Sequence, residues 1–138
     1  MSGVLVEKLK KRSRDFYAEA LRVENPDLAM LFLEQAAQLY IKAVVLELLG
    51  EHVRGHDLRG LLGFLSNKLL VNGYEEEAGL INDFVAQYKS ELIVLEEAYT
   101  IARYSAISYD KEIVDKMAKI VEKLYELLDK VCESVKLG

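Results

Sequence analysis

The sequence contains few of the residues on which disulfide-bonded, metal-binding and β-rich domains depend. Its 138 residues include one cysteine, one proline, eight glycines and no tryptophan. The single cysteine, Cys132, excludes a disulfide scaffold and a multi-cysteine zinc site. So few turn-forming residues argue against an all-β domain, which needs a turn about every 8–12 residues. The chain is therefore expected to be mostly helical.

Long apolar runs and targeting signals are also missing. No uninterrupted apolar run approaches the roughly 18 residues of a transmembrane helix. The N-terminus has no basic region followed by an apolar stretch, as a signal peptide would have. A composition that is 51% hydrophobic and 30% charged suits one packed domain over residues 1–138. We expect a cytoplasmic protein with no membrane contact.

The charge is unevenly distributed along the chain. Residues 1–70 carry 10 basic and 9 acidic side chains, a net +1, and residues 71–138 carry 8 and 14, a net −6. An acidic protein of this kind does not coat nucleic acid broadly. An anion is expected to bind locally, near Arg12, the segment 54–59 or Arg103. The basic run over residues 8–14 can equally be a solvated helix face, although the spacing of Arg12 from Leu9 and Phe16 directs it toward the apolar stripe.

Apolar spacing and capping residues predict five helices. The first covers residues 4–24, and the second covers 26–49, between an Asn25 N-cap and a left-handed Gly50. The third follows an Asp57 cap and ends near residue 71, the fourth covers about 75–103, and the fifth follows an Asp110 cap. These elements predict an all-α, up-and-down bundle of four to five helices.

Two of the predicted helices carry apolar seams whose spacing alternates between four and three residues. Such seams pack lengthwise against neighbouring helices. The fourth helix has Ile81, Val85, Tyr88, Leu92, Leu95, Tyr99 and Ala102, and the fifth has Ile113, Met117, Ile120, Leu124, Leu127 and Val131.

Most catalytic motifs are absent. The chain has no GxGxxG, Walker or HExxH motif, and neither His52 nor His56 follows a glutamate by three residues, as in di-iron bundles. We expect no metal and no cofactor. The densest polar cluster is the segment 51–59, which precedes a predicted helix. It can dock a phosphate at the helix N-terminus, or Asp57 can simply cap that helix while His56 packs beside it.

Three strings taken in order resemble the HEPN domain (higher eukaryotes and prokaryotes nucleotide-binding) over roughly residues 8–130. The first is an alanine-rich helical segment at residues 34–43 that ends near Lys42. The second is Arg54-Gly55-His56-Asp57-Leu58 with Leu61-Leu62, and the third is Tyr99-Thr100-Ile101-Ala102-Arg103-Tyr104.

The resemblance implies a bundle of four or five helices that forms a homodimer, with a functional cleft near the interface. It also implies a nucleotide or RNA ligand and a minimal nucleotidyltransferase as partner, in a two-gene module resembling toxin–antitoxin pairs. The matched positions place Lys42, Arg54, His56, Asp57, Arg103 and Tyr104 in the cleft. Lys42 can alternatively snorkel from its helix, and Arg103 can cap a helix C-terminus.

Some members of the family are metal-independent ribonucleases, in which an arginine is followed by a histidine after four to six residues. None of the six arginines here has a histidine at that spacing. After Arg103 those positions hold Ser108, Tyr109 and Asp110, and a tyrosine is a poor general base at neutral pH. Arg103 and Tyr109 are therefore the catalytic candidates, with a histidine from elsewhere as an alternative partner. Besides a nucleotide-binding module and a ribonuclease, the third alternative is a helical interaction protein without a ligand.

Overall fold

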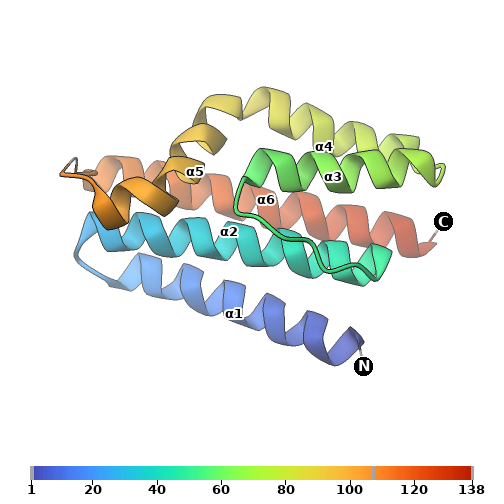
Figure 1. The fold of residues 1–138 in the computed structure, drawn as a ribbon, viewed down its shortest axis with the longest axis horizontal. Coiled ribbons are helices and arrows are strands. Elements are labelled where there is room, and N and C mark those ends of the chain that lie inside the picture. The colour runs from blue at the N-terminus through green and yellow to red at the C-terminus, as the bar shows by residue number, and fades with distance from the viewer. Residues whose placement is uncertain (1, 107, 138) are drawn as a thin grey trace.

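The computed structural model describes residues 2–106 and 108–137 as a bundle of six helices, with no strand among them (Figure 1). The helices are α1 (Ser2–Arg22), α2 (Pro26–Leu49), α3 (Leu58–Val71), α4 (Glu75–Gln87), α5 (Lys89–Tyr104) and α6 (Lys111–Leu137). The all-α bundle expected from the sequence is confirmed. The helix break predicted around residues 104–109 separates α5 from α6, and Ile107 lies outside the described residues.

Helix α2 is the centre of the bundle, because α1, α3, α5 and α6 all pack against it (Figure 1). By length and composition α2 could also cross a membrane, although Glu34 and Lys42 interrupt its apolar run. Most of its apolar window, 61%, is buried inside the bundle. That burial is typical of the core helix of a soluble protein, which passes the same test.

Helix α1 packs mainly on α2 through small residues spaced seven apart. Val6, Ser13 and Ala20 are all buried. The Ser13 hydroxyl donates a hydrogen bond to the Ala36 carbonyl at 2.6 Å, and it lies 2.8 Å from the hydroxyl oxygen of Tyr125. The expectation that Arg12 faces this stripe is wrong, because Arg12 is exposed and Ser13 occupies the inward position. A short hydroxyl side chain fits between closely packed helices where a guanidinium does not.

The predicted fourth helix is two helices, because the chain bends at Tyr88 (φ −110°, ψ 25°). Helix α4 packs chiefly on α3, and α5 chiefly on α2 (Figure 1). The fully buried positions therefore follow two separate faces, including Phe84 on α4 and Ala98 on α5, whereas Tyr99 is only half-buried. In α6 the predicted seam is confirmed, since four of its six residues are buried and Ile113 and Leu127 are half-buried.

Capping residues mark several of the helix boundaries. The Asn25 side chain accepts hydrogen bonds at the start of α2, and Gly50 ends that helix with φ 68°. Asp110 accepts from the Ile113 N–H at 2.8 Å at the start of α6. Asp57 occupies the N-cap position of α3, but its side chain makes no capping hydrogen bond, so the expected side-chain cap is wrong and only its backbone carbonyl bonds to Leu61.

Candidate functional site

Two of the sequence segments that resemble the HEPN domain meet on one aromatic ring. His56, in the connection between α2 and α3, stacks on Tyr99 of α5 with ring centroids 4.1 Å apart and planes within 5°. The guanidinium carbon of Arg103 lies 4.9 Å from the centroid of the same ring. Arg103 also donates a hydrogen bond of 2.8 Å to the hydroxyl of Tyr104. Tyr99 thus holds an imidazole and a guanidinium from segments 47 residues apart in the sequence.

An ion pair explains why the α2–α3 connection reaches α5 at this place. Glu96, one turn before Tyr99, accepts three hydrogen bonds from Arg59 at the start of α3. They come from the Arg59 side-chain nitrogens at 2.8 and 3.1 Å and from its backbone N–H at 3.1 Å. A bidentate arginine–carboxylate pair fixes orientation as well as distance. His56, three residues before Arg59, is thereby positioned over the Tyr99 ring.

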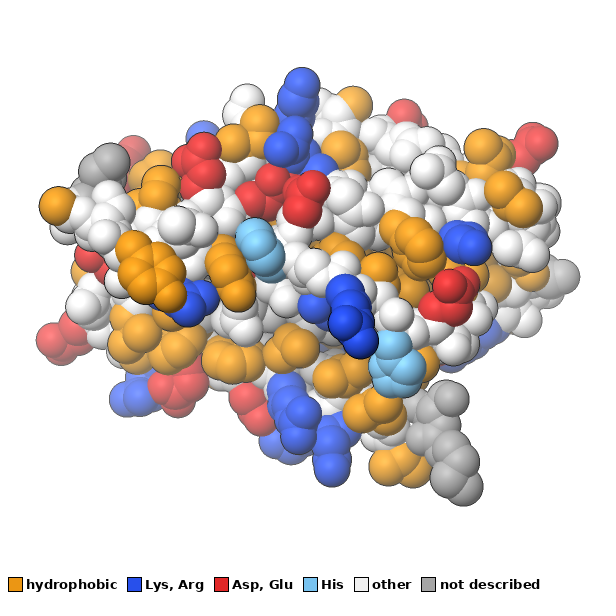
Figure 2. All heavy atoms as spheres, viewed as in Figure 1, with side chains coloured by type: hydrophobic (Ala, Val, Ile, Leu, Met, Phe, Trp, Pro, Cys, Tyr) orange, Lys and Arg blue, Asp and Glu red, His pale blue; other side chains and the backbone are white. Residues whose placement is uncertain are grey.

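Beside this ring is a cavity of about 300 Å³ with a largely apolar wall. It is lined by Phe16, Leu31, Phe32, Gln35, Tyr99 and Arg103. A neighbouring cavity of about 320 Å³ shares Phe16 and Phe32, whose rings lie 5.7 Å apart, and adds Arg12 at its rim. Figure 2 shows hydrophobic, basic and histidine side chains side by side on the face that carries α5 and the α2–α3 connection.

A buried carboxylate lies behind the cavity. Glu34 of α2 has no exposed surface, and its two carboxylate oxygens accept from Gln35 at 2.7 Å and from Gln38 at 2.8 Å. Gln38 in turn accepts from the Lys42 ammonium at 3.1 Å. Burial raises the pKa of Glu34, and the two amide hydrogen bonds and the nearby His56 and Lys42 oppose that rise. The two glutamines therefore supply the hydrogen-bond donors that a buried carboxylate needs.

The structure brings together only some of the residues predicted for the cleft. His56, Arg103 and Tyr104 form one cluster on and around Tyr99. Lys42 donates instead to Gln38, which in turn donates to Glu34. Arg54 and Asp57 instead line a different cavity, of about 260 Å³, beside Phe64.

Tyr109, the other catalytic candidate, lies near the start of α2. Its backbone N–H donates to the Asp27 carboxylate at 2.7 Å. Its hydroxyl is buried with no hydrogen-bond partner among the described residues, and burial raises its pKa. Because a higher pKa keeps the phenol protonated, Tyr109 is poorly suited to accept a proton. In the described part of the chain no contact joins it to Arg103.

Three residues of the site were not predicted as site residues. Tyr99 was expected as a seam residue and as part of the third family-like string, and Glu34 and Gln35 were quoted only within an alanine-rich helix. The available signal was a glutamate that is followed by a glutamine one and four residues later, on an otherwise apolar helix. A buried carboxylate needs donors, and these two positions can supply them on one helix face.

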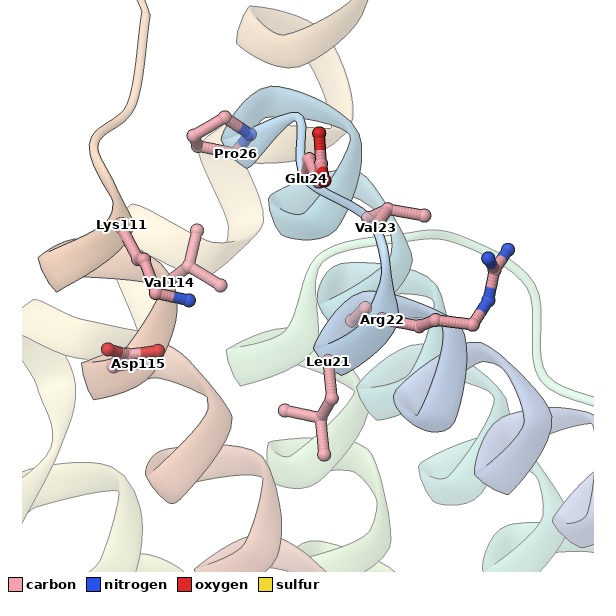
Figure 3. Close-up of a pocket in the computed structure, with 9 residues that line it drawn as sticks. Leu21, Arg22, Val23, Glu24, Pro26, Lys111, Val114 and Asp115 are labelled. Atoms are coloured by element: carbon pink, nitrogen blue, oxygen red, sulfur yellow. The ribbon is translucent and has the colours of Figure 1, made fainter.

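A further cavity, of about 360 Å³, lies at the turn between α1 and α2 beside the start of α6. Figure 3 shows the Arg22 side chain directed away from Lys111 and Asp115 of α6. This cavity contains none of the residues predicted for the cleft. Among the described residues, no three His, Cys, Asp or Glu side chains are grouped so as to hold a metal ion.

The fold and the site define a helical-bundle domain with a basic and aromatic cleft between α1, α2 and α5, beside the connection that follows α2. The family model described as "HEPN domain" matches residues 6–131, and the chain belongs to this family. Membership supports a nucleotide-interacting or ribonuclease-like module in general. Searches of curated proteins and of solved structures found no match.

Proposed function

We propose that the protein is a nucleotide-binding module that uses the cluster around Tyr99. The observation that carries this proposal is that His56 and Arg103 are held on one ring at the edge of an apolar-walled cavity. A guanidinium offers paired donors that match the oxygens of a phosphate. The phosphate contacts Arg103 and His56, and the base lies against Phe16 and Phe32.

Titration calorimetry with adenosine and guanosine mono- and triphosphates tests this proposal. Arg103→Ala removes charge-assisted hydrogen bonds, each worth about 1.5–3 kcal/mol, so nucleotide affinity is expected to fall roughly 10-fold or more. His56→Ala is expected to weaken binding less. The matched control is Arg22→Ala, since Arg22 is an exposed arginine whose ion-pair partner within the described residues is Glu19 on its own helix. Absence of heat at millimolar nucleotide, or equal losses in Arg103→Ala and Arg22→Ala, contradicts the proposal.

We further propose that the module works in the cytoplasm as a homodimer and partners a minimal nucleotidyltransferase in a two-gene, toxin–antitoxin-like system. The family resemblance supports this. So does the apolar surface beside the cleft, where Tyr104 is 75% exposed. Size-exclusion chromatography at several concentrations tests the dimer, and co-purification with the product of a neighbouring nucleotidyltransferase gene tests the partner. A monomer at high micromolar concentration contradicts the dimer.

A metal-independent ribonuclease is the second candidate, because His56 and Arg103 contact the same Tyr99 ring although the sequence motif is missing. His56 shares the Tyr99 ring with Arg103 and can act as a general base on a ribose 2′-hydroxyl. Arg103 would then stabilise the charge that develops on the phosphate. Incubation with RNA in the presence of a chelator tests this. Cleavage that survives both His56→Ala and Arg103→Ala, or no cleavage by the unmodified protein, rejects it.

A further inference from the structure

The side chain of Gln35 is held in one orientation by the buried carboxylate behind it. Its amide nitrogen donates to Glu34 at 2.7 Å, and an ionised carboxylate can only accept. The second carboxylate oxygen is already bonded to Gln38, whose own amide oxygen accepts from Lys42. Because Lys42 has donors only, it fixes the direction of the Gln38 amide, and the ionised form of Glu34 fixes that of the Gln35 amide.

That orientation leaves the amide oxygen of Gln35 as an unused acceptor at the cavity. Gln35 lines the cavity together with Phe32 and Arg103, and among the described residues no group donates to its oxygen. An acceptor held by a buried network costs little reorganisation when a ligand binds. The cavity therefore presents one fixed acceptor, one guanidinium and an apolar wall.

We propose that Gln35 is a specificity-determining residue that accepts a hydrogen bond from the exocyclic amino group of a bound purine, with Glu34 as its positioning residue. This inference rests on the nucleotide-binding function proposed above and specifies its ligand class. Among the side chains that line the cavity, Gln35 has an amide group and Arg103 has a positive charge. A guanidinium cannot accept a hydrogen bond, and the Tyr99 side chain is hydrogen-bonded with Arg103, which raises the pKa of that guanidinium. Gln35 is therefore the acceptor we assign to an N–H group of the ligand.

The test compares adenosine 5′-monophosphate with purine riboside 5′-monophosphate, which differs only by lacking the amino group. One neutral hydrogen bond is worth about 0.5–1.5 kcal/mol, so the unmodified protein is expected to bind the amino-bearing nucleotide about 3- to 10-fold more tightly. Gln35→Met keeps the length of the side chain without its acceptor. It is expected to remove the preference by lowering the affinity for adenosine 5′-monophosphate toward that for purine riboside 5′-monophosphate.

Glu34→Gln tests the positioning role, because a neutral amide can pair with Gln35 in either orientation. In this variant, the ratio of the affinities for adenosine 5′-monophosphate and purine riboside 5′-monophosphate is expected to fall toward one. Circular dichroism of the variant establishes that the bundle is intact. If Glu34→Gln does not fold, Gln35→Met alone decides the inference. Equal binding of both nucleotides by the unmodified protein, or a preference that survives Gln35→Met, overturns this inference but leaves the proposed function standing. Failure to bind either nucleotide overturns both.

Discussion

Ser13 offers the sharpest test of how α1 is held on the bundle. It is buried, its hydroxyl donates to the Ala36 carbonyl at 2.6 Å, and it lies 2.8 Å from the Tyr125 hydroxyl. Tyr125 also donates to the Ser13 backbone carbonyl at 3.2 Å. One small side chain therefore connects α1 with both α2 and α6.

The cost of Ser13→Ala follows from these contacts. Loss of a buried hydrogen bond that leaves a partner unsatisfied costs about 1–3 kcal/mol. Tyr125 keeps its longer bond to the backbone, and alanine improves the helix propensity by up to about 0.7 kcal/mol. The net expected loss is about 1–2 kcal/mol in the free energy of unfolding. For a domain of this size that lowers the melting temperature by roughly 3–10 °C.

Urea unfolding and calorimetry of Ser13→Ala, Tyr125→Phe and the double variant measure the effect. Ser90→Ala, at an exposed serine on α5, is the control and should change stability by less than about 0.5 kcal/mol. The double-mutant cycle is expected to give a coupling of about 1 kcal/mol. A Ser13→Ala variant as stable as Ser90→Ala, or strictly additive effects with Tyr125→Phe, refutes the reasoning.

Three further predictions concern the rest of the fold. Burial raises the pKa of the Cys132 thiol to about 12. At pH 8 dithiobis(nitrobenzoate) should therefore label Cys132 only in denaturant. Rapid labelling of the folded protein contradicts this prediction. Gly50→Ala forces a left-handed φ on alanine and should lower the free energy of unfolding by about 1 kcal/mol in urea titrations. Gly63→Ala lies within α3 and has open space around its added methyl group. It should raise the free energy of unfolding by about 0.5–1 kcal/mol in the same titrations. Glu96→Gln weakens the pair with Arg59 and should cost about 1 kcal/mol; an unchanged urea midpoint contradicts that value.

Most helix boundaries could be predicted because they depend on local chemistry. The Asn25 cap, the left-handed Gly50 and the Asp110 cap act within four residues of the chain. The bend at Tyr88 could not be predicted, because no proline or glycine marks it. It results from α4 and α5 burying different faces against different helices, and tertiary packing of this kind overrides a regular spacing.

The candidate site was only half predictable for a related reason. The family resemblance supplied His56 and Arg103 as separate positions, but nothing local to either segment indicates that they share the Tyr99 ring. A half-buried tyrosine at seam spacing looks like a core residue in the sequence. Gln35 and Glu34 could not be recognised for the same reason, since the sequence does not show that Glu34 is buried and that Gln35 lines a cavity.

The two side chains on the Tyr99 ring depend on different parts of the fold. Arg103 lies one turn beyond Tyr99 on α5 itself, so its position requires only that helix. His56 reaches the ring from the connection, whose exit into α3 is tied to α5 by Arg59 and Glu96. Loosening that pair therefore displaces the imidazole while leaving the guanidinium in place. For this reason, the contacts that we propose between His56 and a nucleotide depend on the stability of the connection, whereas those proposed for Arg103 do not.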